Sequence, residues 1–344
     1  MRMLFFLLAG CVCLTGCQPQ QHHAQAYVFG TLVEIQIDAT DSAQAQAASE
    51  AVLARYQALH QQLHAWQPGE LTMLNEAIHR GQAAIPVSPF LASQLQYAQT
   101  LARQSEQLFN PAIGQLVALW GFHRDQFSAV DIPQQTLDAL VASQPQMRDL
   151  QIDAHQVTSH NPQVQIDLGG YAKGEALDEG ASILKAHGIR HALINIGGNV
   201  IALGQHQGRP WRVGIQHPRH PGALAALDLP DGWTIGTSGD YQRFYRKNGV
   251  RYCHIIDPRS GYPATGTQSA TVLIAPQAHA GILSDAASKP LFIAPSHAAT
   301  LARQLGVTAW LLVDKRGHIQ LNPAMQSRIQ WLDSEAARHA SVVP

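Results

Sequence analysis

The sequence predicts a folded protein that combines helices and strands. Of its 344 residues, 46% are apolar and 14% are charged, which is typical of well-packed globular proteins. Segments with the period of a strand and segments with the composition of a helix follow one another along the chain. A chain of this length buries either one large core or two lobes of ordinary domain size. The net charge of −1 and the lack of a basic run argue against a nucleic-acid partner.

The amino terminus has the pattern of a bacterial export signal. Arg2 precedes an apolar run, residues 4–14, that is too short to span a bilayer. The run leads into Leu-Thr-Gly-Cys, which resembles a lipobox with cleavage before Cys17. We therefore predict a lipoprotein signal peptide over residues 1–16, lipidation of Cys17 and a polar tether over residues 17–26. The alternative is an ordinary secretory signal followed by an unmodified cysteine.

The cysteine count agrees with an exported lipoprotein. Cys11 and Cys13 leave with the signal and Cys17 carries the lipid, so only Cys253 remains in the folded domain. A single cysteine cannot form an internal disulfide. Cys253 precedes His254, which suggests a nucleophile as one alternative. Neighbours on a strand point to opposite faces, however, so we expect Cys253 to be a buried strand residue.

The first half of the chain alternates predicted strands and helices. Residues 27–37 alternate apolar and polar side chains and predict a half-buried strand. Residues 41–63 and 88–104 predict helices, the second with proline in its first turn. An Asn-Pro pair then predicts a hairpin that joins residues 157–159 to residues 164–167.

A strand-to-helix turn follows in the segment DLGGYAKGEALDE, residues 167–179. The strand is expected to end at Asp167, and two glycines let the backbone approach a ligand closely. A helix is expected to begin near Tyr171, with its free amides pointing back at the turn, and Lys173 adds a positive charge. This arrangement predicts a phosphate site. The alternative is an ordinary strand-to-helix turn.

A second candidate site lies in residues 237–264. A small-residue turn is expected to start a strand at Asp240, and Asn-Gly at 248–249 predicts a tight hairpin. The return strand, residues 250–256, ends at an Asp-Pro pair because proline cannot continue a ladder. His254 and Asp257 therefore come at the end of a strand, between two turns, where catalytic residues are often found.

The rest of the chain predicts short strands and one further helix. Residues 326–344 have no clear pattern and are expected to form a tail without a readable function. We expect strands at residues 191–201, 211–215 and 267–275, a helix at 278–290 and a closing hairpin from 311–314 and 319–321.

Four motifs resemble those of the ApbE family of FAD:protein FMN transferases, in the family's order. They are LFN followed by LWGF (108–122), DLGGYAKGEALDE (167–179), TSGDY followed by HIIDPRSGYP (237–263) and SDAASK (284–289). The resemblance covers residues 27–313, nearly the whole mature chain. It implies an α+β fold with two lobes, mixed or antiparallel sheets, flanking helices and an FAD cleft between the lobes. The implied transferase domain spans residues 27–325.

The same resemblance implies which residues bind FAD. Phe29 stands where the family carries methionine, and it either stacks on the flavin or packs in the core. Trp66 stands where the family carries an aromatic that covers the flavin ring, with core packing as the alternative. Asn110 replaces the family's aspartate, which keeps the hydrogen-bonding shape and loses the charge. The full implied set is Phe29, Trp66, Leu108, Phe109, Asn110, Asp167, Lys173, Asp240 and Ile256.

The resemblance also implies a Mg²⁺ site. Its ligands are the carboxylate of Asp285, the backbone carbonyl of Gly170 and the residue at position 289, which is usually threonine. Here Lys289 stands at that position, and an ammonium cannot ligate a metal ion. Either Mg²⁺ is held by fewer protein groups, with phosphate oxygens completing its shell, or Lys289 neutralises a phosphate directly.

The implied reaction is Mg²⁺-dependent transfer of FMN from FAD to a Thr or Ser hydroxyl of a partner protein, with release of AMP. His254 is the expected general base, Lys173 supplies positive potential, and Asp257 orients His254 only if the strand bends. Family precedent points to acceptor subunits of membrane redox complexes and to a lipid anchor on the periplasmic face of the inner membrane, with the outer membrane as the alternative. The alternative activities are an FAD pyrophosphatase and a flavin-binding lipoprotein that only carries FAD.

Overall fold

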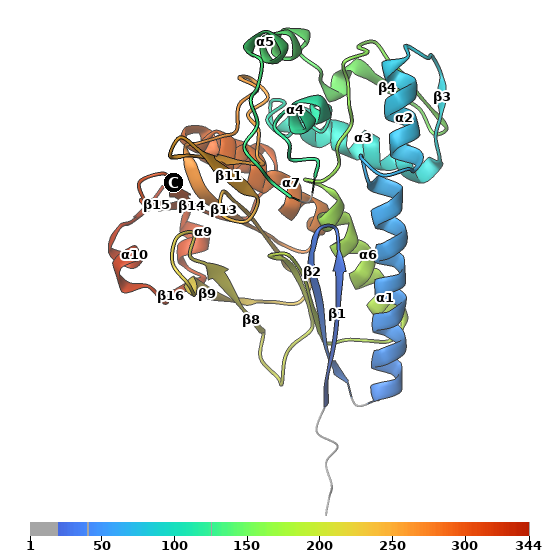
Figure 1. The fold of residues 1–344 in the computed structure, drawn as a ribbon. Coiled ribbons are helices and arrows are strands. Elements are labelled where there is room, and N and C mark those ends of the chain that lie inside the picture. Colours follow the sequence, from blue (N-terminus) through green and yellow to red (C-terminus); the bar gives the residue numbers. More distant parts are fainter. Residues whose placement is uncertain (1–19, 40, 125, 344) are drawn as a thin grey trace, which may run out of the picture.

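The computed structural model describes residues 20–39, 41–124 and 126–343 (Figure 1). The expected signal peptide and the expected lipidation site, Cys17, lie outside the described residues. The fold is α+β, as the resemblance implied. Within the described ranges, no helix combines the length and the apolar character needed to cross a bilayer.

The described chain opens with a long hairpin and not with a polar tether. β1 (Gln20–Val28) pairs in antiparallel register with β2 (Thr31–Ala39), and Phe29 and Gly30 form the turn with φ angles of 57° and 68°. The tether prediction is therefore wrong for residues 20–26. Backbone pairing does not depend on polar or apolar side chains, and polar pairs form across the two strands, as where Gln25 Nε2 donates to Glu34 Oε1 at 3.2 Å.

This hairpin forms one edge of a sheet that has nine strands among the described residues. The order is β1-β2-β6-β7-β10-β13-β14-β15-β17, and every neighbouring pair is antiparallel except β15 with β17. The further strands are β6 (Ala192–Ile196), β7 (Asn199–Leu203), β10 (Thr234–Gly239), β13 (Thr267–Ile274), β14 (Ala309–Asp314), β15 (Ile319–Leu321) and β17 (Ala340–Val342).

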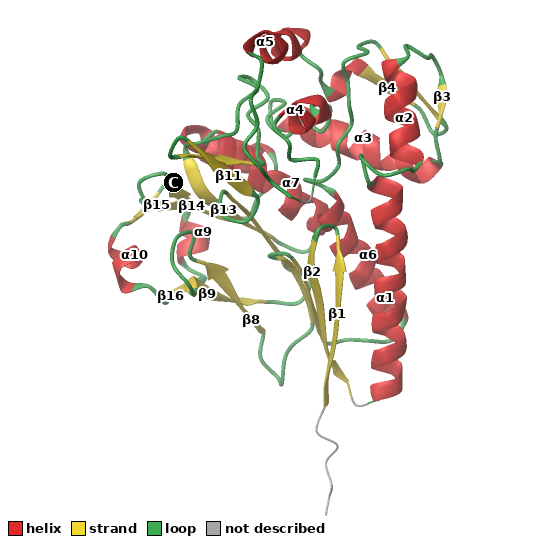
Figure 2. Ribbon diagram, in the orientation of Figure 1, coloured by secondary structure: helices red, strands yellow, loops and turns green. Residues whose placement is uncertain are grey.

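Three helices pack side by side against this sheet (Figure 2): α1 (Ser42–Leu63), α6 (Ala172–Ala186) and α7 (Ala280–Ile293). The helix predicted over residues 41–63 is confirmed, with Asp41 as its cap. α6 and α7 touch at Gly174, where an added Cβ would lie 2.4 Å from Ile282 Cα. Only glycine permits this approach, which brings the start of α6 against α7.

A second, three-stranded sheet covers the other face of the large sheet. Its strands are β8 (Trp211–Gln216), β9 (Ala223–Leu229) and β16 (Ile329–Trp331). Trp211 and Leu227 pack there against Leu193 of β6 and Leu273 of β13. The neighbouring residues along β6 and β13 point to the helices, as the period of two along a strand requires.

Another group of helices and short strands packs beyond the top of α1 and α6 (Figure 1). The helix predicted over residues 88–104 is confirmed, and Ser88 Oγ caps it by accepting from Leu91 N at 3.1 Å. The elements are α2 (Glu70–His79), β3 (Ile85–Pro86), α3 (Pro89–Gln104), α4 (Gly114–Leu119), α5 (Gln134–Ser143), η1 (Met147–Asp149), β4 (Leu150–Ile152) and β5 (Gln156–Ser159).

The hairpin predicted around residues 161–162 does not form. β5 pairs with β3 and β4, and Ile85 and Ile152 both pair with Val157. Residues 164–167 instead run beside residues 111–114, where Gln165 N donates to Ala112 O at 3.1 Å. Both segments carry the alternating pattern. β5 pairs with its neighbour β4 and with the distant β3, and residues 164–167 pair with a segment that is also distant in sequence, so local turn chemistry could not reveal these long-range partners.

The carboxyl-terminal segment is folded, contrary to the predicted tail. Within it, β16 pairs with β9, α10 (Ser334–Arg338) is capped by Asp333, and β17 runs parallel to β15. These elements are three to five residues long, too short for a period to be recognised. The remaining elements are β11 (Phe244–Lys247), β12 (Val250–Cys253), η2 (Pro295–His297), α8 (Ala298–Gln304) and α9 (Pro323–Gln326).

Candidate active site

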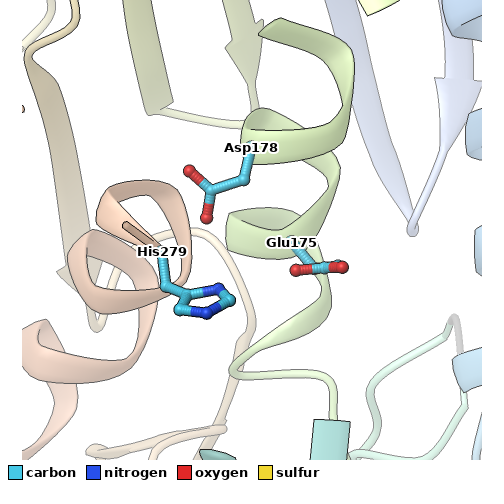
Figure 3. A group of neighbouring side chains, drawn as sticks. All are labelled: Glu175, Asp178 and His279. Carbon is cyan, nitrogen blue, oxygen red and sulfur yellow. The ribbon is translucent and has the colours of Figure 1, made fainter. Parts of the chain in front are cut away.

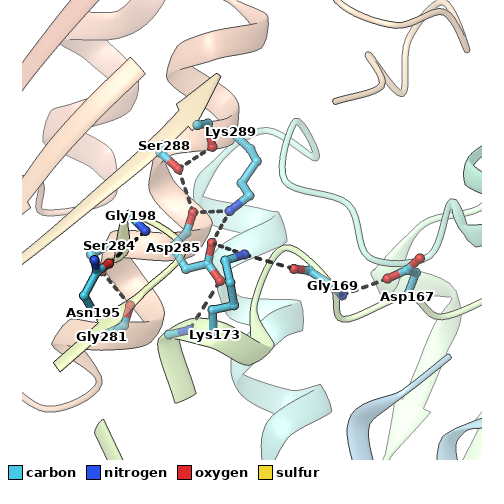
Figure 4. Close-up of polar contacts among 12 residues, drawn as sticks. Asp167, Gly169, Lys173, Asn195, Gly198, Gly281, Ser284, Asp285, Ser288 and Lys289 are labelled. Carbon is cyan, nitrogen blue, oxygen red and sulfur yellow. Dashed lines mark hydrogen bonds and ion pairs between the residues drawn. The ribbon is translucent and has the colours of Figure 1, made fainter. Parts of the chain in front are cut away.

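The turn before α6 and the helix start lie where the sequence predicted, but no strand ends at Asp167, because Gln165 forms only an isolated bridge with Ile113. Asp167 Oδ1 accepts from Gly169 N at 2.7 Å, and α6 begins at residue 172 with Tyr171 as its cap residue. The Tyr171 hydroxyl is buried and donates to Gln94 Oε1 at 2.7 Å, which fixes the helix start. Lys173 Nζ lies 3.5 Å from Gly169 O, so its charge is held at the turn (Figure 4).

Trp66 and Asp167, which the sequence assigned separately to FAD binding, lie in contact. The half-buried Trp66 donates from Nε1 to Asp167 Oδ2 at 3.0 Å, and its ring lies 5.3 Å from that of His123. Trp66 also lines a cavity of about 390 Å³. Other residues that line the cavity include Thr72, Asn75, Gln115 and Gln165.

Asp285 is the centre of the most highly charged buried group in this region (Figure 4). It lies on α7 with 1% exposure, and its Oδ1 pairs with both Lys289 Nζ and, at 3.4 Å, Lys173 Nζ. Gly174 N donates to Oδ2 at 3.3 Å. Burial alone would raise the pKa of Asp285, but the two ammonium groups outweigh it and lower the pKa to about 2. The carboxyl is therefore ionised throughout the physiological range.

The residues at the expected Mg²⁺ position do not fit a divalent cation. Lys289 Nζ donates to the Asp285 carboxylate and, at 2.6 Å, to the Asp285 carbonyl. The same side chain passes Gly170, where an added Cβ would lie 3.1 Å from Lys289 Cε and 3.8 Å from Nζ. Two unit charges 4 Å apart repel by about 4 kcal/mol at an effective dielectric constant of about 20, and a dication doubles that cost. The ammonium therefore lies against Asp285 and near Gly170, the two other residues expected to ligate the ion.

A second group, Glu175 and Asp178 of α6 with His279 at the start of α7, lies at the junction of the two helices (Figure 3). Their potential ligand atoms are within 4.8 Å of one another. Asp178 Oδ1 accepts from Gly281 N at 2.8 Å and Oδ2 accepts from Ile282 N at 3.0 Å, which closes the start of α7. Burial, with the nearby carboxylates adding to it, raises the pKa of Glu175 to about 7. We assign this group to the helix junction and not to a metal.

His254 follows β12 directly and is held neutral. Burial lowers the pKa of His254 well below its usual value, and the charges of Arg243, Lys173 and Lys289 lower it further. Its Nδ1 lies 3.3 Å from Arg243 O, so the tautomer with Nδ1–H donates there and leaves Nε2 as an acceptor. The positive charges of Lys173 and Lys289 lower the pKa of both His254 and Asp285.

Asp257 does not orient His254. Its Oδ1 accepts from Arg259 N and from Arg259 Nε, both at 2.9 Å, and its Oδ2 accepts from Arg259 Nη2 at 2.7 Å. Its carbonyl accepts from Gly261 N at 2.8 Å. Aspartate commonly closes a turn in this way, and residues three apart on a strand face opposite sides. The catalytic assignment of Asp257 is therefore corrected to a turn-forming one.

Asp240 is engaged by arginines. The sequence placed it at the start of a strand, but it follows the end of β10. Arg219 forms a two-point ion pair with its carboxylate at 2.7 and 2.6 Å, and Arg251 Nη1 lies 3.4 Å from its Oδ1. The Asp240 carboxylate therefore supports the loop after β10, and its expected FAD contact stays a prediction.

The other expected flavin residues lie in several different parts of the structure. The Asn110 side chain donates to Pro145 O at 2.9 Å and accepts from Ala112 N at 3.1 Å, so it connects its own loop to the segment after α5. Phe29, at the β1–β2 turn, contacts the rings of Tyr56 and His60. Leu108 and Phe109 are buried in the main core, and Ile256 is buried with Trp120 and Phe122. Their contacts with flavin stay predictions.

Cys253 is a buried strand residue, as expected. It is 1% exposed, and burial raises the pKa of its thiol to about 12. A protonated, enclosed thiol is a poor nucleophile, so the alternative role of Cys253 is removed.

The family model described as "ApbE family" matches residues 29–311. The chain belongs to the ApbE family. It is 43% identical over 308 residues to the FAD:protein FMN transferase of Rhodobacter capsulatus, covering 89% of this chain and 58% of that relative. It is 31% identical to the FAD:protein FMN transferase of Treponema pallidum, covering 89% and 88% of the two chains. The crystal structure of the ApbE protein of Thermotoga maritima superposes with a TM-score of 0.80 at 26% identity, covering 90% and 99%.

Two arginines near the ApbE-family motifs were not identified from the sequence. Arg219 pairs with Asp240, but it lies in a loop whose composition gives no signal. Arg243 accepts the His254 contact through its carbonyl and lowers the pKa of His254 through its charge. Its position three residues after Asp240, inside the motif stretch, was the one available signal.

Proposed function

We propose that this protein transfers the FMN moiety of FAD to a Thr or Ser hydroxyl of a partner protein and releases AMP. The observation that carries the proposal is the convergence of two ammonium groups and the amino terminus of a 15-residue helix on one buried carboxylate, with both ammonium charges also acting on the neutral imidazole of His254. The names of the curated relatives support the same activity. The chain spans 58% of the length of the Rhodobacter relative, so the activity of that longer protein is applied to this chain only as a proposal.

The chemistry requires a base and a fixed positive potential. His254 Nε2 accepts the proton of the acceptor hydroxyl while the hydroxyl oxygen attacks the phosphorus on the FMN side of the pyrophosphate. A new phosphoester bond forms, the bond to the AMP oxygen breaks, and AMP leaves with the electron pair. Lys173, Lys289 and the positive end of the α6 dipole stabilise the charge on the phosphate oxygens.

The flavin half of FAD is proposed to lie against Trp66. An indole that donates to Asp167 is held in one orientation, and its remaining half-exposed face suits an aromatic ring. Asp167 belongs to the turn that carries Lys173, so one segment connects the flavin and pyrophosphate positions. The magnesium dependence expected from the family is not carried into these steps because the residues at that position do not fit the ion.

We also propose lipidation at Cys17 and a location on the periplasmic face of the bacterial membrane. Cys17 is three positions before Gln20, the first residue of β1. Because β1 belongs to the main sheet, such an anchor keeps the domain close to the bilayer. A subunit of a membrane redox complex, presenting a Thr or Ser near the surface, fits this placement as the acceptor.

The test is incubation of the protein with FAD in the presence or absence of a candidate acceptor subunit. Flavin bound covalently to the acceptor, with an equal amount of AMP, is the expected result. AMP and free FMN, independent of acceptor, would instead establish a pyrophosphatase. Tight FAD binding without AMP release would leave only an FAD carrier. The absence of both FAD binding and AMP release would reject all three activities.

A further inference from the structure

We propose that the ε-ammonium of Lys289 replaces the divalent cation beside Asp285, so that FAD binds and reacts here without a metal at this position. This inference rests on the proposed function, because it concerns how the pyrophosphate of FAD is neutralised. It makes Lys289 a substrate-binding residue where the ApbE family resemblance placed a metal ligand.

The position of the ammonium supports the replacement. Lys289 and Asp285 are four residues apart on α7, so both side chains lie on one face of the helix. Lys289 Nζ contacts the Asp285 carboxylate, and its side chain runs along Gly170 at the turn before α6. Asp285 and Gly170, two of the three residues expected to ligate Mg²⁺, thus lie beside the charged nitrogen of the third, Lys289.

The charges around Asp285 do not balance. One carboxylate faces two ammonium groups, Lys173 and Lys289, which leaves a net charge of +1 in a largely buried group. Lys173 and Lys289 side chains are 22% and 15% exposed, respectively, so little water screens them. Excess buried charge is unfavourable unless an opposite charge binds, and a pyrophosphate supplies it. A purely structural ion pair would need only one of the two lysines.

The hydrogen-bonding capacity of Lys289 points the same way. An ammonium has three N–H donors, and two of them have acceptors in the carboxylate and the carbonyl of Asp285. Within the described part of the chain, the contacts of Lys289 Nζ are with Asp285 alone. One donor therefore remains for a phosphate oxygen, at the helix start where phosphates bind.

The test compares the wild type with Lys289→Thr, which restores the residue usual in the family. Mn²⁺ alone is titrated into the protein without FAD and followed by electron paramagnetic resonance. We expect about one bound Mn²⁺ in Lys289→Thr and none at this site in the wild type. Lys185→Thr, at the exposed end of α6, is the matched control and should behave as the wild type.

A second measurement follows FAD affinity by calorimetry in EDTA and in Mg²⁺. The wild type should bind FAD equally in both buffers, within about twofold. Lys289→Thr should bind about 10- to 100-fold more weakly in EDTA, because a charge-assisted hydrogen bond is lost, and Mg²⁺ should restore its affinity. Lys289→Met keeps the volume of the side chain and should lose affinity without rescue by Mg²⁺.

Two outcomes would overturn the inference. One is Mn²⁺ bound beside Asp285 in the wild type; the other is wild-type FAD affinity that collapses in EDTA. If the wild type binds no FAD in either buffer, the proposed function fails, while the Mn²⁺ titration still decides whether the ammonium excludes the metal. Circular dichroism of each variant identifies any loss of binding that comes from misfolding.

Discussion

Two acidic groups on the same pair of helices, α6 and α7, differ in what satisfies their carboxylates (Figures 3 and 4). Asp178 accepts from two backbone amides at the start of α7. Asp285 pairs with two ammonium groups and accepts from one amide. The two backbone amides satisfy the hydrogen-bonding capacity of Asp178 from within the protein. The second group keeps an excess positive charge, which makes it a site for an anion.

The comparison teaches that residue type alone does not identify a site. A search for acidic and histidine side chains finds Glu175, Asp178 and His279, yet Asp178 is committed to the backbone of α7. The proposed active site has one acid and two lysines. We expect variants at Asp285 to affect chemistry and variants at Asp178 to affect stability.

The largest effect is expected for Asp285→Ala. Without the carboxylate, Lys173 and Lys289 repel each other and lose their fixed positions, so AMP release from FAD should fall by about 10³-fold. Asp285→Asn keeps the shape and should also be impaired, since the amide carries no charge. An unchanged rate of AMP release in Asp285→Ala would show that Asp285 and its two lysines take no part in the reaction.

His254→Ala should lower flavin transfer by about 10²-fold while FAD affinity stays near that of the wild type. The side chain accepts a proton during the reaction and is not needed to hold the pyrophosphate. Transfer is measured as covalent flavin on the acceptor, and FAD affinity by calorimetry. If affinity and transfer fall together, His254 is a structural residue and not the base.

Asp178→Ala should lower the free energy of unfolding by about 2 kcal/mol, because two amides at the start of α7 lose their acceptor. Chemical denaturation measures the change. FAD affinity should change by less than about threefold. A large loss of affinity with unchanged stability would contradict the assignment of this group to the helix junction.

Glu175→Gln should change how stability depends on pH. The pKa of Glu175 is raised in the folded state to about 7 from 4.5. Its stabilising contribution is therefore complete below pH 4.5 and lost as pH rises through about 7. Between pH 5 and pH 8 the free energy of unfolding of the wild type should fall by on the order of 1–2 kcal/mol more than that of Glu175→Gln. Parallel stability curves for the two proteins would show that Glu175 has an ordinary pKa.

Features fixed by neighbouring residues could be predicted from the sequence. The Asn248-Gly249 pair takes φ angles of 51° and 77° and joins β11 to β12, as its turn chemistry requires. Ser88 and Pro89 start α3 at the expected residue. The turn from Asp167 to Lys173 was also predicted in the right place, because glycines, a helix start and a lysine are close in sequence.

Features that depend on which of several possible partners a segment meets could not be predicted. Residues 20–26 were expected to form part of a tether, but they pair with β2, and residues 164–167 pair with residues 111–114 and not in a hairpin. Asp257 was expected near His254 and pairs with Arg259. In each case several partners satisfied the same local pattern, and the packing of the whole chain selected one.

The sequence by itself determined the family, the positions of the motifs and the replacement at Lys289. Only the tertiary structure decided that Lys289, Lys173 and Asp285 meet at one point, because they come from two helices that approach at Gly174. The tertiary structure also decided the neutral state of His254, since burial and neighbouring charges set the pKa of a side chain. Residue identity is a property of the sequence, whereas burial and the distances between charges are properties of the packed chain.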